Sequence, residues 1–309
     1  MDISSNRTFH SNGKLMLSGE YIVLEGALSL SVPLVKGQEL VVNYYDKKPA
    51  LSWKTYIQDE YWFTANYSLP DLAIGNTNDF QIAQNLRKIL LNARVLNKEF
   101  LKPAHFIDVR TNIDFNINWG LGSSSSLIAN IARWANIDPF DLHFKVSEGS
   151  GYDIAAAISS VPVLYRLEND KPVFERVNFY PQFHDKIFFA YLGKKQNSAR
   201  AVADFKRSSG DHSYEIEEIT KISQNLVTAE NMMDFIHLVR QHDEILSGIL
   251  NVKTIAETRY KDFKGYVKSL GAWGGDFAMF ITDYPKDYLF SYFRKRDIVH
   301  WFAYKEIVK

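Results

Sequence analysis

Residues 120–126 read GLGSSSS, and this short stretch decides how the rest of the chain is interpreted. An alternating segment at residues 106–115 precedes it, and apolar residues at helical spacing follow it from Leu127 onward. A strand, a glycine-containing loop and the first turn of a helix together form a cradle for an anion. Glycines let the backbone approach closely, and a helix N-terminus carries partial positive charge. The pattern predicts a phosphate-binding loop.

A plainer interpretation of residues 120–126 is a serine-rich helix cap beside a flexible turn. Serine hydroxyls can accept hydrogen bonds from the amides of a first helical turn, so the serine run can cap the helix. The stretch is not a Walker loop, because no Gly-Lys-Ser/Thr follows at the required spacing. These residues alone leave both interpretations open.

The flanking sequence alternates predicted strands with predicted helices. Short apolar runs separated by glycines, or rich in aromatic residues, predict strands early in the chain, and an Asn-Asp pair precedes the first helical pattern. This order favours an α+β fold over a regular doubly wound sheet. The predicted strands cover residues 14–40, 40–67, 106–115, 162–167, 186–192 and 277–282, and the predicted helices 79–97, 127–135, 213–250 (with one or two breaks) and 286–295.

Composition excludes several classes of protein. The 309 residues contain 36 Lys and Arg and 36 Asp and Glu, so the chain lacks the broad positive field that non-specific nucleic-acid binding needs. Cysteine is absent, which excludes disulfides, cysteine-ligated zinc and a thiolate nucleophile. With no signal-peptide pattern and no membrane-length apolar run, we expect a cytoplasmic monomer or homodimer without nucleic-acid or membrane partners.

Three further stretches change the balance: NGKLMLSGEYIVLEG at 12–26, GSGYDIAAA at 149–157 and KSLGAWGGDFAMF at 268–280. With residues 120–126, and in this order, they resemble the motifs of the GHMP kinases (galactokinase, homoserine kinase, mevalonate kinase and phosphomevalonate kinase). The resemblance spans nearly the whole chain. The matching residues are Gly13, Lys14, Gly19, Glu20 and Tyr21 in the first motif, Gly120 to Ser125 in the second, Asp153 in the acidic stretch, and Lys268, Gly271, Ala272, Gly274, Gly275 and Asp276 in the third.

The resemblance implies a two-lobed α+β fold, with an N-terminal lobe like ribosomal protein S5 and a ferredoxin-like C-terminal lobe. We place the boundary in the charged segment LENDKPVFER, giving an ATP-binding domain at residues 1–175 and a second kinase domain at 176–309. It also implies an ATP- and Mg²⁺-dependent kinase of small molecules.

Individual roles follow from the same resemblance. Lys14 and Asp153 are the expected catalytic residues, and Ser124 is the expected magnesium ligand. Glu148 is the nearest acidic candidate for the metal, with a solvated helix-end glutamate as the alternative. Trp273 stands where relatives have glycine, and either stacks beside the nucleotide or packs into the core. The expected ATP-binding residues are Gly120, Leu121, Gly122, Ser123, Ser124, Ser125, Gly274 and Gly275.

The acceptor is expected to be a small anion. The donors in GKKQNSARAV could clamp a carboxylate or a phosphate, or form an ordinary solvated turn. Tyr21, Asp276 and the run from Asp153 to Ala155 resemble the bacterial phosphomevalonate kinases, so phosphomevalonate is the expected acceptor. Mevalonate kinase, a non-catalytic ATP-binding paralogue and a diphosphomevalonate decarboxylase remain alternatives. The expected acceptor-binding residues are Glu20, Tyr21, Lys194, Lys195, Ser198 and Arg200.

Overall fold

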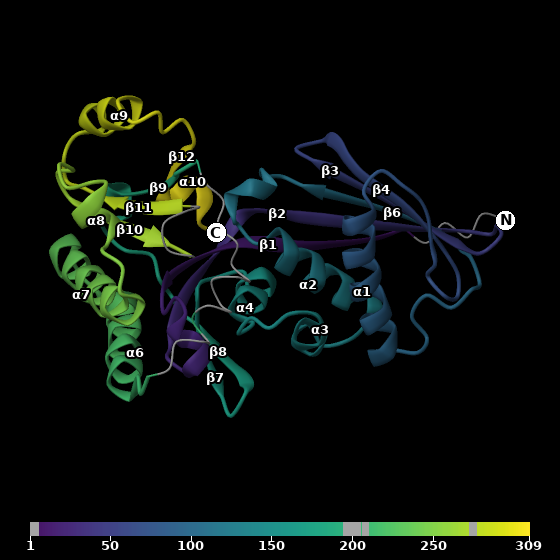
Figure 1. Ribbon diagram of the computed structural model, residues 1–309. Helices are drawn as coiled ribbons and strands as arrows, with labels where there is room; N and C mark the ends of the chain where they lie inside the picture. Colours follow the sequence, from purple (N-terminus) through teal and green to yellow (C-terminus); the bar gives the residue numbers. More distant parts are fainter. Residues whose placement is uncertain (1–5, 194–204, 206–209, 272–276) are drawn as a thin grey trace. The chain divides into compact units, whose positions relative to one another are not determined.

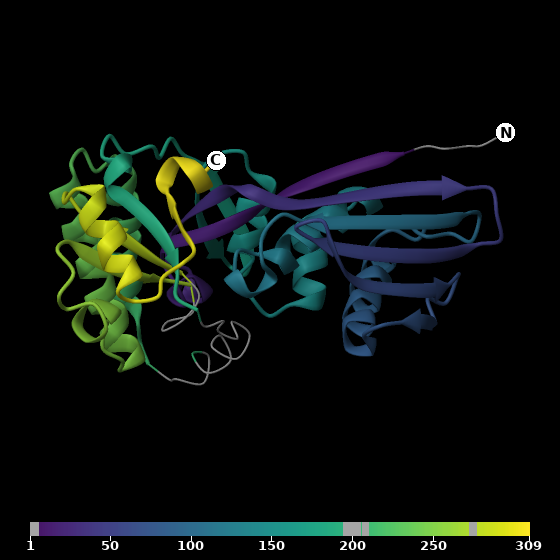
Figure 2. The same cartoon turned by 90° about the horizontal axis from the view of Figure 1, so that it is seen from above.

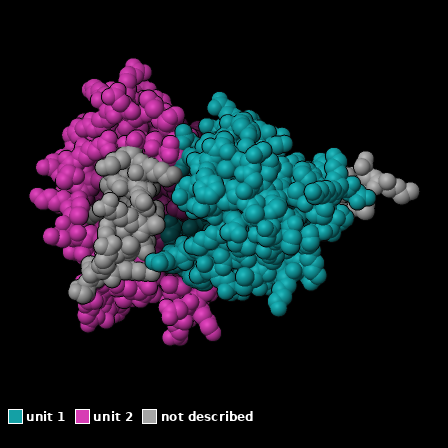
Figure 3. Space-filling model, turned by 45° about the vertical axis from the view of Figure 1, so that its right-hand side comes forward, with its two compact units in different colours: residues 1–13, 36–117, 121–158 teal, residues 14–35, 118–120, 159–309 magenta. Residues whose placement is uncertain are grey.

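The computed structural model describes residues 6–193, 205, 210–271 and 277–309 (Figure 1). The chain forms two compact units, and neither is continuous in sequence. Unit 1 comprises residues 1–13, 36–117 and 121–158, and unit 2 comprises 14–35, 118–120 and 159–309 (Figure 3). Two long strands, β1 (Arg7–Ser18) and β2 (Ser29–Tyr45), contribute residues to both units.

Unit 1 is a sheet with helices packed on one face (Figures 1 and 2). Its strands run in the order β5-β4-β3-β6-β2, with β3 and β6 parallel and the other pairs antiparallel. Alternate strand residues face the helices and make an apolar core, in which the Trp134 ring lies 4.7 Å from Phe100 and 6.4 Å from Trp53. The remaining elements of unit 1 are β3 (Ala50–Ile57), β4 (Glu60–Ser68), β5 (Ile74–Thr77), α1 (Phe80–Leu96), β6 (Phe106–Ile113), α2 (Ser123–Ala135), α3 (Pro139–Val146) and α4 (Tyr152–Ile158).

Unit 2 contains a hairpin, β7 and β8, that pairs with the first residues of β2, and a separate antiparallel sheet of order β10-β11-β9-β12. The second sheet is covered on both faces, by α9 on one and by α6 and α7 on the other (Figure 1). The elements are η1 (Ile22–Glu25), η2 (Ile117–Trp119), β7 (Val163–Glu168), β8 (Lys171–Arg176), η3 (His184–Lys186), β9 (Ile187–Tyr191), α6 (Ser213–Thr228), α7 (Met232–Leu250), α8 (Ile255–Thr258), β10 (Tyr266–Leu270), β11 (Phe277–Ile281), α9 (Lys286–Arg294), β12 (Trp301–Ala303) and α10 (Tyr304–Ile307).

The α+β class predicted from the sequence is confirmed. The helix predicted at 79–97 is α1, which Asp79 caps by accepting a hydrogen bond from the Ile82 amide. The region 213–250 is divided into α6 and α7, because Asn231 caps a new helix there. The boundary between residues 175 and 176 stays a prediction. Among the described residues, no helix is long and apolar enough to cross a membrane.

Phe280 on β11 tests how much the second sheet depends on its α9 face. The side chain is fully buried, and its ring lies 4.9 Å from Phe293 and 5.2 Å from both Tyr260 and Phe263. Replacing it with alanine leaves a cavity, so Phe280→Ala should lower the free energy of unfolding by about 3–5 kcal/mol in urea denaturation. Tyr214→Ala, at a residue that is 68% exposed, should change it by less than about 0.5 kcal/mol. Equal losses would contradict this view of the core.

Candidate functional site

The loop at 120–126 opens helix α2 of unit 1. Gly122 is the N-cap residue and has φ 92° and ψ 34°, a left-handed conformation that residues with a Cβ rarely adopt. The Ser125 hydroxyl donates to the Gly122 carbonyl at 2.9 Å, and the Ser126 hydroxyl oxygen lies 3.1 Å from the Ser123 carbonyl oxygen. Ser124 is exposed on the first turn.

The sequence left open that the serine run caps α2, and the described residues do not show this cap. Among the described residues, no side-chain hydrogen bond caps this helix. The buried hydroxyl of Ser125 donates to the Gly122 carbonyl, and that of Ser126 lies near the Gln38 side-chain oxygen and the Ser123 carbonyl. The N–H groups of a first helical turn have no acceptor inside the helix.

A buried polar network holds α2 in place beneath the loop. The Ser126 hydroxyl donates to Gln38 Oε1 at 2.9 Å, and Asn130 Nδ2 donates to the Gln38 carbonyl at 2.8 Å. The Ser11 hydroxyl donates in turn to Asn130 Oδ1 at 2.8 Å. These four side chains are buried in unit 1, so the first turn of α2 rests on a fixed base.

Asp153 lies in the first turn of α4, which packs against α2. Its Oδ1 accepts a hydrogen bond from the Ile154 amide at 3.1 Å, and its side chain is half-buried. A contact from α3 holds the segment that leads into α4. The Nε2 atom of buried His143 lies 3.2 Å from the Gly149 carbonyl oxygen. Glu148 in that segment is exposed. No three His, Asp or Glu side chains of the described residues gather closely enough to hold a metal ion.

Lys14, the other predicted catalytic residue, belongs to unit 2. Its ammonium group donates to the Gly120 carbonyl at 3.2 Å, so it reaches the first residue of the predicted phosphate loop. Trp119 precedes Gly120 and is buried, with its ring 5.2 Å from His300 and 5.6 Å from Phe302. This aromatic packing anchors the beginning of the loop in unit 2.

Glu20 and Lys268 meet in the interior of unit 2. Lys268 Nζ lies 3.0 Å from Glu20 Oε1 and 2.9 Å from Asp243 Oδ1, and the Tyr266 hydroxyl donates to Asp243 Oδ2 at 3.1 Å. Burial by itself raises the pKa of Glu20, but the charge of Lys268, together with the adjacent imidazole of His242, outweighs it and lowers that pKa to about 2. Burial lowers the pKa of Lys268, and the carboxylates of Asp243 and Glu20 raise it above its ordinary value. The carboxylate of Glu20 and the ammonium group of Lys268 therefore stay charged at neutral pH.

His242 and Asp243 were not among the residues predicted from the sequence. The sequence feature that could have identified them is two adjacent polar residues on the apolar face of a helix. In α7 they lie on the buried side between Val239 and Leu246. An amphipathic pattern does not say whether such residues are solvated or paired, because their partner Lys268 is 25 residues away in β10.

Several predicted site residues lie outside the described residues. They are Lys194, Lys195, Ser198 and Arg200 of the predicted acceptor cluster, and Trp273, Gly274 and Gly275 of the third motif.

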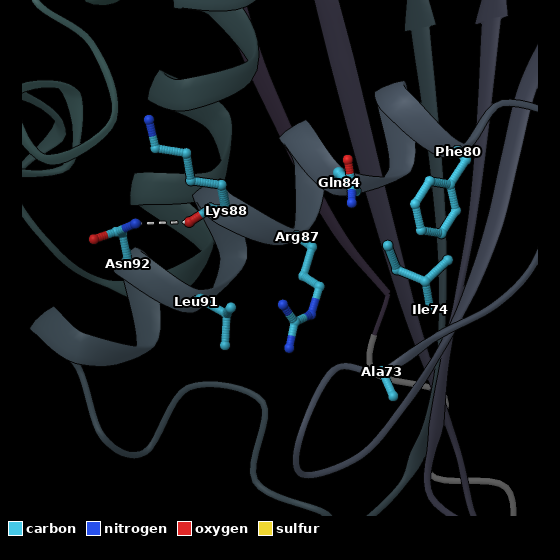
Figure 4. A pocket seen from close by; sticks show the side chains of 8 residues that line it. All are labelled: Ala73, Ile74, Phe80, Gln84, Arg87, Lys88, Leu91 and Asn92. Atoms are coloured by element: carbon cyan, nitrogen blue, oxygen red, sulfur yellow. Dashed lines mark hydrogen bonds between the residues drawn. The ribbon is translucent and has the colours of Figure 1, made fainter.

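A cavity of about 520 Å³ in unit 1 does not include any predicted site residue (Figure 4). It follows one side of α1, with Phe80 and Ile74 together at one end and Arg87 between the two ends (Figure 4). Arg87 Nε donates to the Leu72 carbonyl at 2.7 Å, so its guanidinium supports the neighbouring loop.

No protein-family model and no curated protein matches the sequence. Solved structures match along almost its full length. A mevalonate kinase from Methanococcus jannaschii is 18% identical with a TM-score of 0.71, over 96% of this chain and 97% of that one. A phosphomevalonate kinase from Streptococcus pneumoniae, in complex with phosphomevalonate and AMPPNP, is 17% identical with a TM-score of 0.69, over 96% and 99%.

This chain has the fold of the GHMP kinases. The fold also occurs in a mevalonate diphosphate decarboxylase from Staphylococcus aureus, which is 12% identical with a TM-score of 0.61 over 99% of this chain and 95% of that one. The GHMP kinase fold predicted from the sequence is thus confirmed, and it is common to enzymes that differ in their reaction.

The buried pair of Glu20 and Lys268 makes acid stability a test of the unit 2 network. The pKa of Glu20 is depressed from its ordinary 4.5 to about 2, so its contribution is present above about pH 4.5 and is lost as the pH falls toward 2. The loss amounts to about 3 kcal/mol. Urea unfolding at about pH 6 and about pH 3 should show a smaller pH dependence for Glu20→Gln than for the wild type. The exposed neighbour variant Glu244→Gln should keep the wild-type dependence, and identical behaviour of both variants would contradict the pairing.

Proposed function

We propose that the chain is an ATP-dependent kinase that transfers a phosphoryl group to a small anionic metabolite, and that this metabolite is phosphomevalonate. The observation that carries the proposal is the start of α2. An exposed Ser124 follows a left-handed Gly122 there, on a helical turn that has no side-chain cap among the described residues. Amides and a hydroxyl presented together at a helix N-terminus suit a phosphate chain that carries a divalent cation.

The residues present fit ATP and Mg²⁺. The amides of residues 120–125 can contact phosphate oxygens, and the exposed hydroxyl of Ser124 can ligate the cation. No cluster of three acidic or histidine side chains is available as a separate metal site among the described residues. We propose that the nucleotide brings the metal ion with it. Its protein ligands would then be Ser124 and a single carboxylate such as Glu148. Magnesium-bound ATP supplies the phosphoryl group and neutralises charge on it.

Lys14 and Asp153 have distinct proposed roles. Lys14 places a positive charge at the Gly120 end of the loop, which favours charge on the transferred group. Asp153, half-buried at the start of α4, orients the acceptor. With a phosphate as the acceptor, Asp153 has no essential proton to remove, because that group is already largely ionised near neutral pH.

The acceptor side of the proposal uses Tyr21 and the donors Lys194, Lys195, Ser198 and Arg200. The S. pneumoniae structure supports the choice of acceptor, since it holds phosphomevalonate in the same fold. Gly274 and Gly275 complete the proposed nucleotide contacts.

A coupled ADP-release assay tests the proposal against mevalonate, phosphomevalonate, galactose and homoserine, each with and without Mg²⁺. Magnesium-dependent ADP release with phosphomevalonate alone supports it. Release with mevalonate and none with phosphomevalonate would keep the kinase and change the acceptor. The absence of ADP release with all four acceptors would contradict the proposed function.

Ser124 and Ser126 are a matched pair for separating chemistry from folding. Ser124→Ala should lower kcat at least about ten-fold while leaving Tm unchanged, because its exposed hydroxyl makes no contribution to the core. Ser126→Ala should lower Tm, with a loss of about 1–3 kcal/mol, because it leaves buried Gln38 Oε1 without its donor. Thermal unfolding and steady-state kinetics of both variants check this. A parallel fall of Tm and kcat in Ser124→Ala would count against a metal-ligand role.

Asp153→Asn distinguishes the two kinds of acceptor. If the acceptor is phosphomevalonate, the variant should retain measurable turnover, and the acidic limb of the pH profile should persist because the substrate phosphate sets it. If the acceptor is a hydroxyl, loss of a general base should cost about 10²–10⁴-fold, and that limb should disappear. Comparison of the kcat/KM pH profiles of variant and wild type decides between them.

A further inference from the structure

The segment that joins β1 to β2 carries the first motif, and helix α6 holds it through buried side chains. The Ser223 hydroxyl donates to the Leu28 carbonyl at 2.7 Å and lies 2.8 Å from the Ser18 hydroxyl. Thr220 accepts from the Leu28 amide at 3.0 Å. These contacts lie within unit 2 and join residues that are far apart in sequence.

Helix α7 adds a contact to the backbone of the motif itself. The Gly19 amide donates to His242 Nε2 at 2.8 Å, across 223 positions of sequence, and His242 is fully buried. A nitrogen that accepts this hydrogen bond carries no proton, so the proton of neutral His242 is on Nδ1. Nδ1 lies 3.4 Å from Asp243 Oδ1 and 3.1 Å from Lys268 Nζ. With the proton on Nδ1, Asp243 is its acceptor, and the Lys268 ammonium directs its hydrogens to the carboxylates of Asp243 and Glu20, at 2.9 and 3.0 Å.

Glu20 is the competing partner for the same nitrogen. Its Oε2 lies 3.1 Å from His242 Nε2, but neither oxygen of Glu20 has hydrogen-bond geometry to any described residue. The Gly19 amide has that geometry, which favours Nε2 as an acceptor. Lys268 lies close to the carboxylates of Glu20 and Asp243, and its single positive charge offsets part of their two buried negative charges.

The turn that this contact holds is sterically demanding. Gly19 has φ +89°, and a Cβ at this position would lie 2.6 Å from Ser29 Cβ. Tyr21 has φ 65°, a left-handed conformation that costs free energy for a residue with a large side chain. Its ring lies 5.6 Å from Phe205. Such a turn persists only where its surroundings fix it, and the buried acceptor on His242 does so at Gly19.

We infer that His242 is a positioning residue of the phosphoryl-transfer site: its Nε2 fixes the Gly19 amide and thereby the place of Tyr21 on the acceptor side. Glu20 and Lys268 act with it from the interior and not by touching the acceptor. This inference rests on the proposed function for its kinetic consequence, whereas the contact between His242 and Gly19 stands on geometry alone.

The two amide variants of His242 separate its nitrogens. In His242→Gln the side-chain oxygen can occupy the place of Nε2 and still accept from the Gly19 amide. In His242→Asn the shorter side chain reaches only the place of Nδ1, so the Gly19 amide is left buried without an acceptor. We expect His242→Asn to raise the KM for phosphomevalonate about ten-fold with little change in the KM for ATP, and His242→Gln to stay within about three-fold of wild type.

Thr282→Val serves as the matched control for stability. Thr282 is buried in unit 2 and its hydroxyl donates to the Lys264 carbonyl at 2.6 Å, so its loss removes a comparable hydrogen bond elsewhere. This variant should lose stability without a change in either KM. A rise in the acceptor KM in Thr282→Val as well as His242→Asn would show general destabilisation and would overturn the inference.

Two measurements are independent of turnover. Hydrogen–deuterium exchange of peptides covering residues 17–23 should be slow in the wild type and in His242→Gln, and at least about ten-fold faster in His242→Asn. Nitrogen-15 NMR of the wild type should show His242 protonated on Nδ1, which needs no variant to fold. Equal exchange in the two variants, or a proton on Nε2, would overturn the inference. A wild type that phosphorylates none of the acceptors but shows this exchange pattern would remove the proposed function and leave the positioning contact standing.

Discussion

Lys268 carries a positive charge in the interior of unit 2, where Glu20 and Asp243 lie within 3.0 Å of its ammonium group. A buried charge without such partners costs several kcal/mol, so Lys268 can be charged in the interior only because the carboxylates are beside it. The three come from the turn after β1, from α7 and from β10, and their pairing fixes how those elements pack. The first and third motifs, which are about 250 residues apart in sequence, are adjacent because this ion pair joins them.

The loop of unit 1 differs from this network in how its polar groups are arranged. The network in unit 2 pairs buried charges with one another, whereas no side-chain hydrogen bond caps the start of α2 among the described residues. The polar base formed by Gln38, Asn130 and Ser11 makes that turn rigid without using its amides. A preorganised set of donors costs little reorganisation when a phosphate binds, which is what phosphoryl transfer requires of a protein.

Periodicity and capping residues predicted much of the fold. Asp79 before an amphipathic run predicted α1, and the alternation of apolar and polar residues predicted β6. Both patterns reflect interactions between residues that are close in sequence. The serine run shows the limit of local signals: its hydroxyls can cap a helix, but in the fold the Ser126 hydroxyl bonds to the side chain of Gln38, 88 positions away in sequence. His242 and Asp243 could not be found in this way, since their roles depend on Gly19 and Lys268, which only the tertiary fold brings to them.

The fate of the γ-phosphoryl group tests the central claim most directly. Phosphorus-31 NMR of the protein with ATP, Mg²⁺ and phosphomevalonate would follow that group without a coupling enzyme. The account predicts that it appears in a new organic diphosphate, in equal amount to the ADP formed. Its appearance as inorganic phosphate, or an unchanged ATP spectrum, would contradict a kinase and point instead to a decarboxylase or to a protein that only binds the nucleotide.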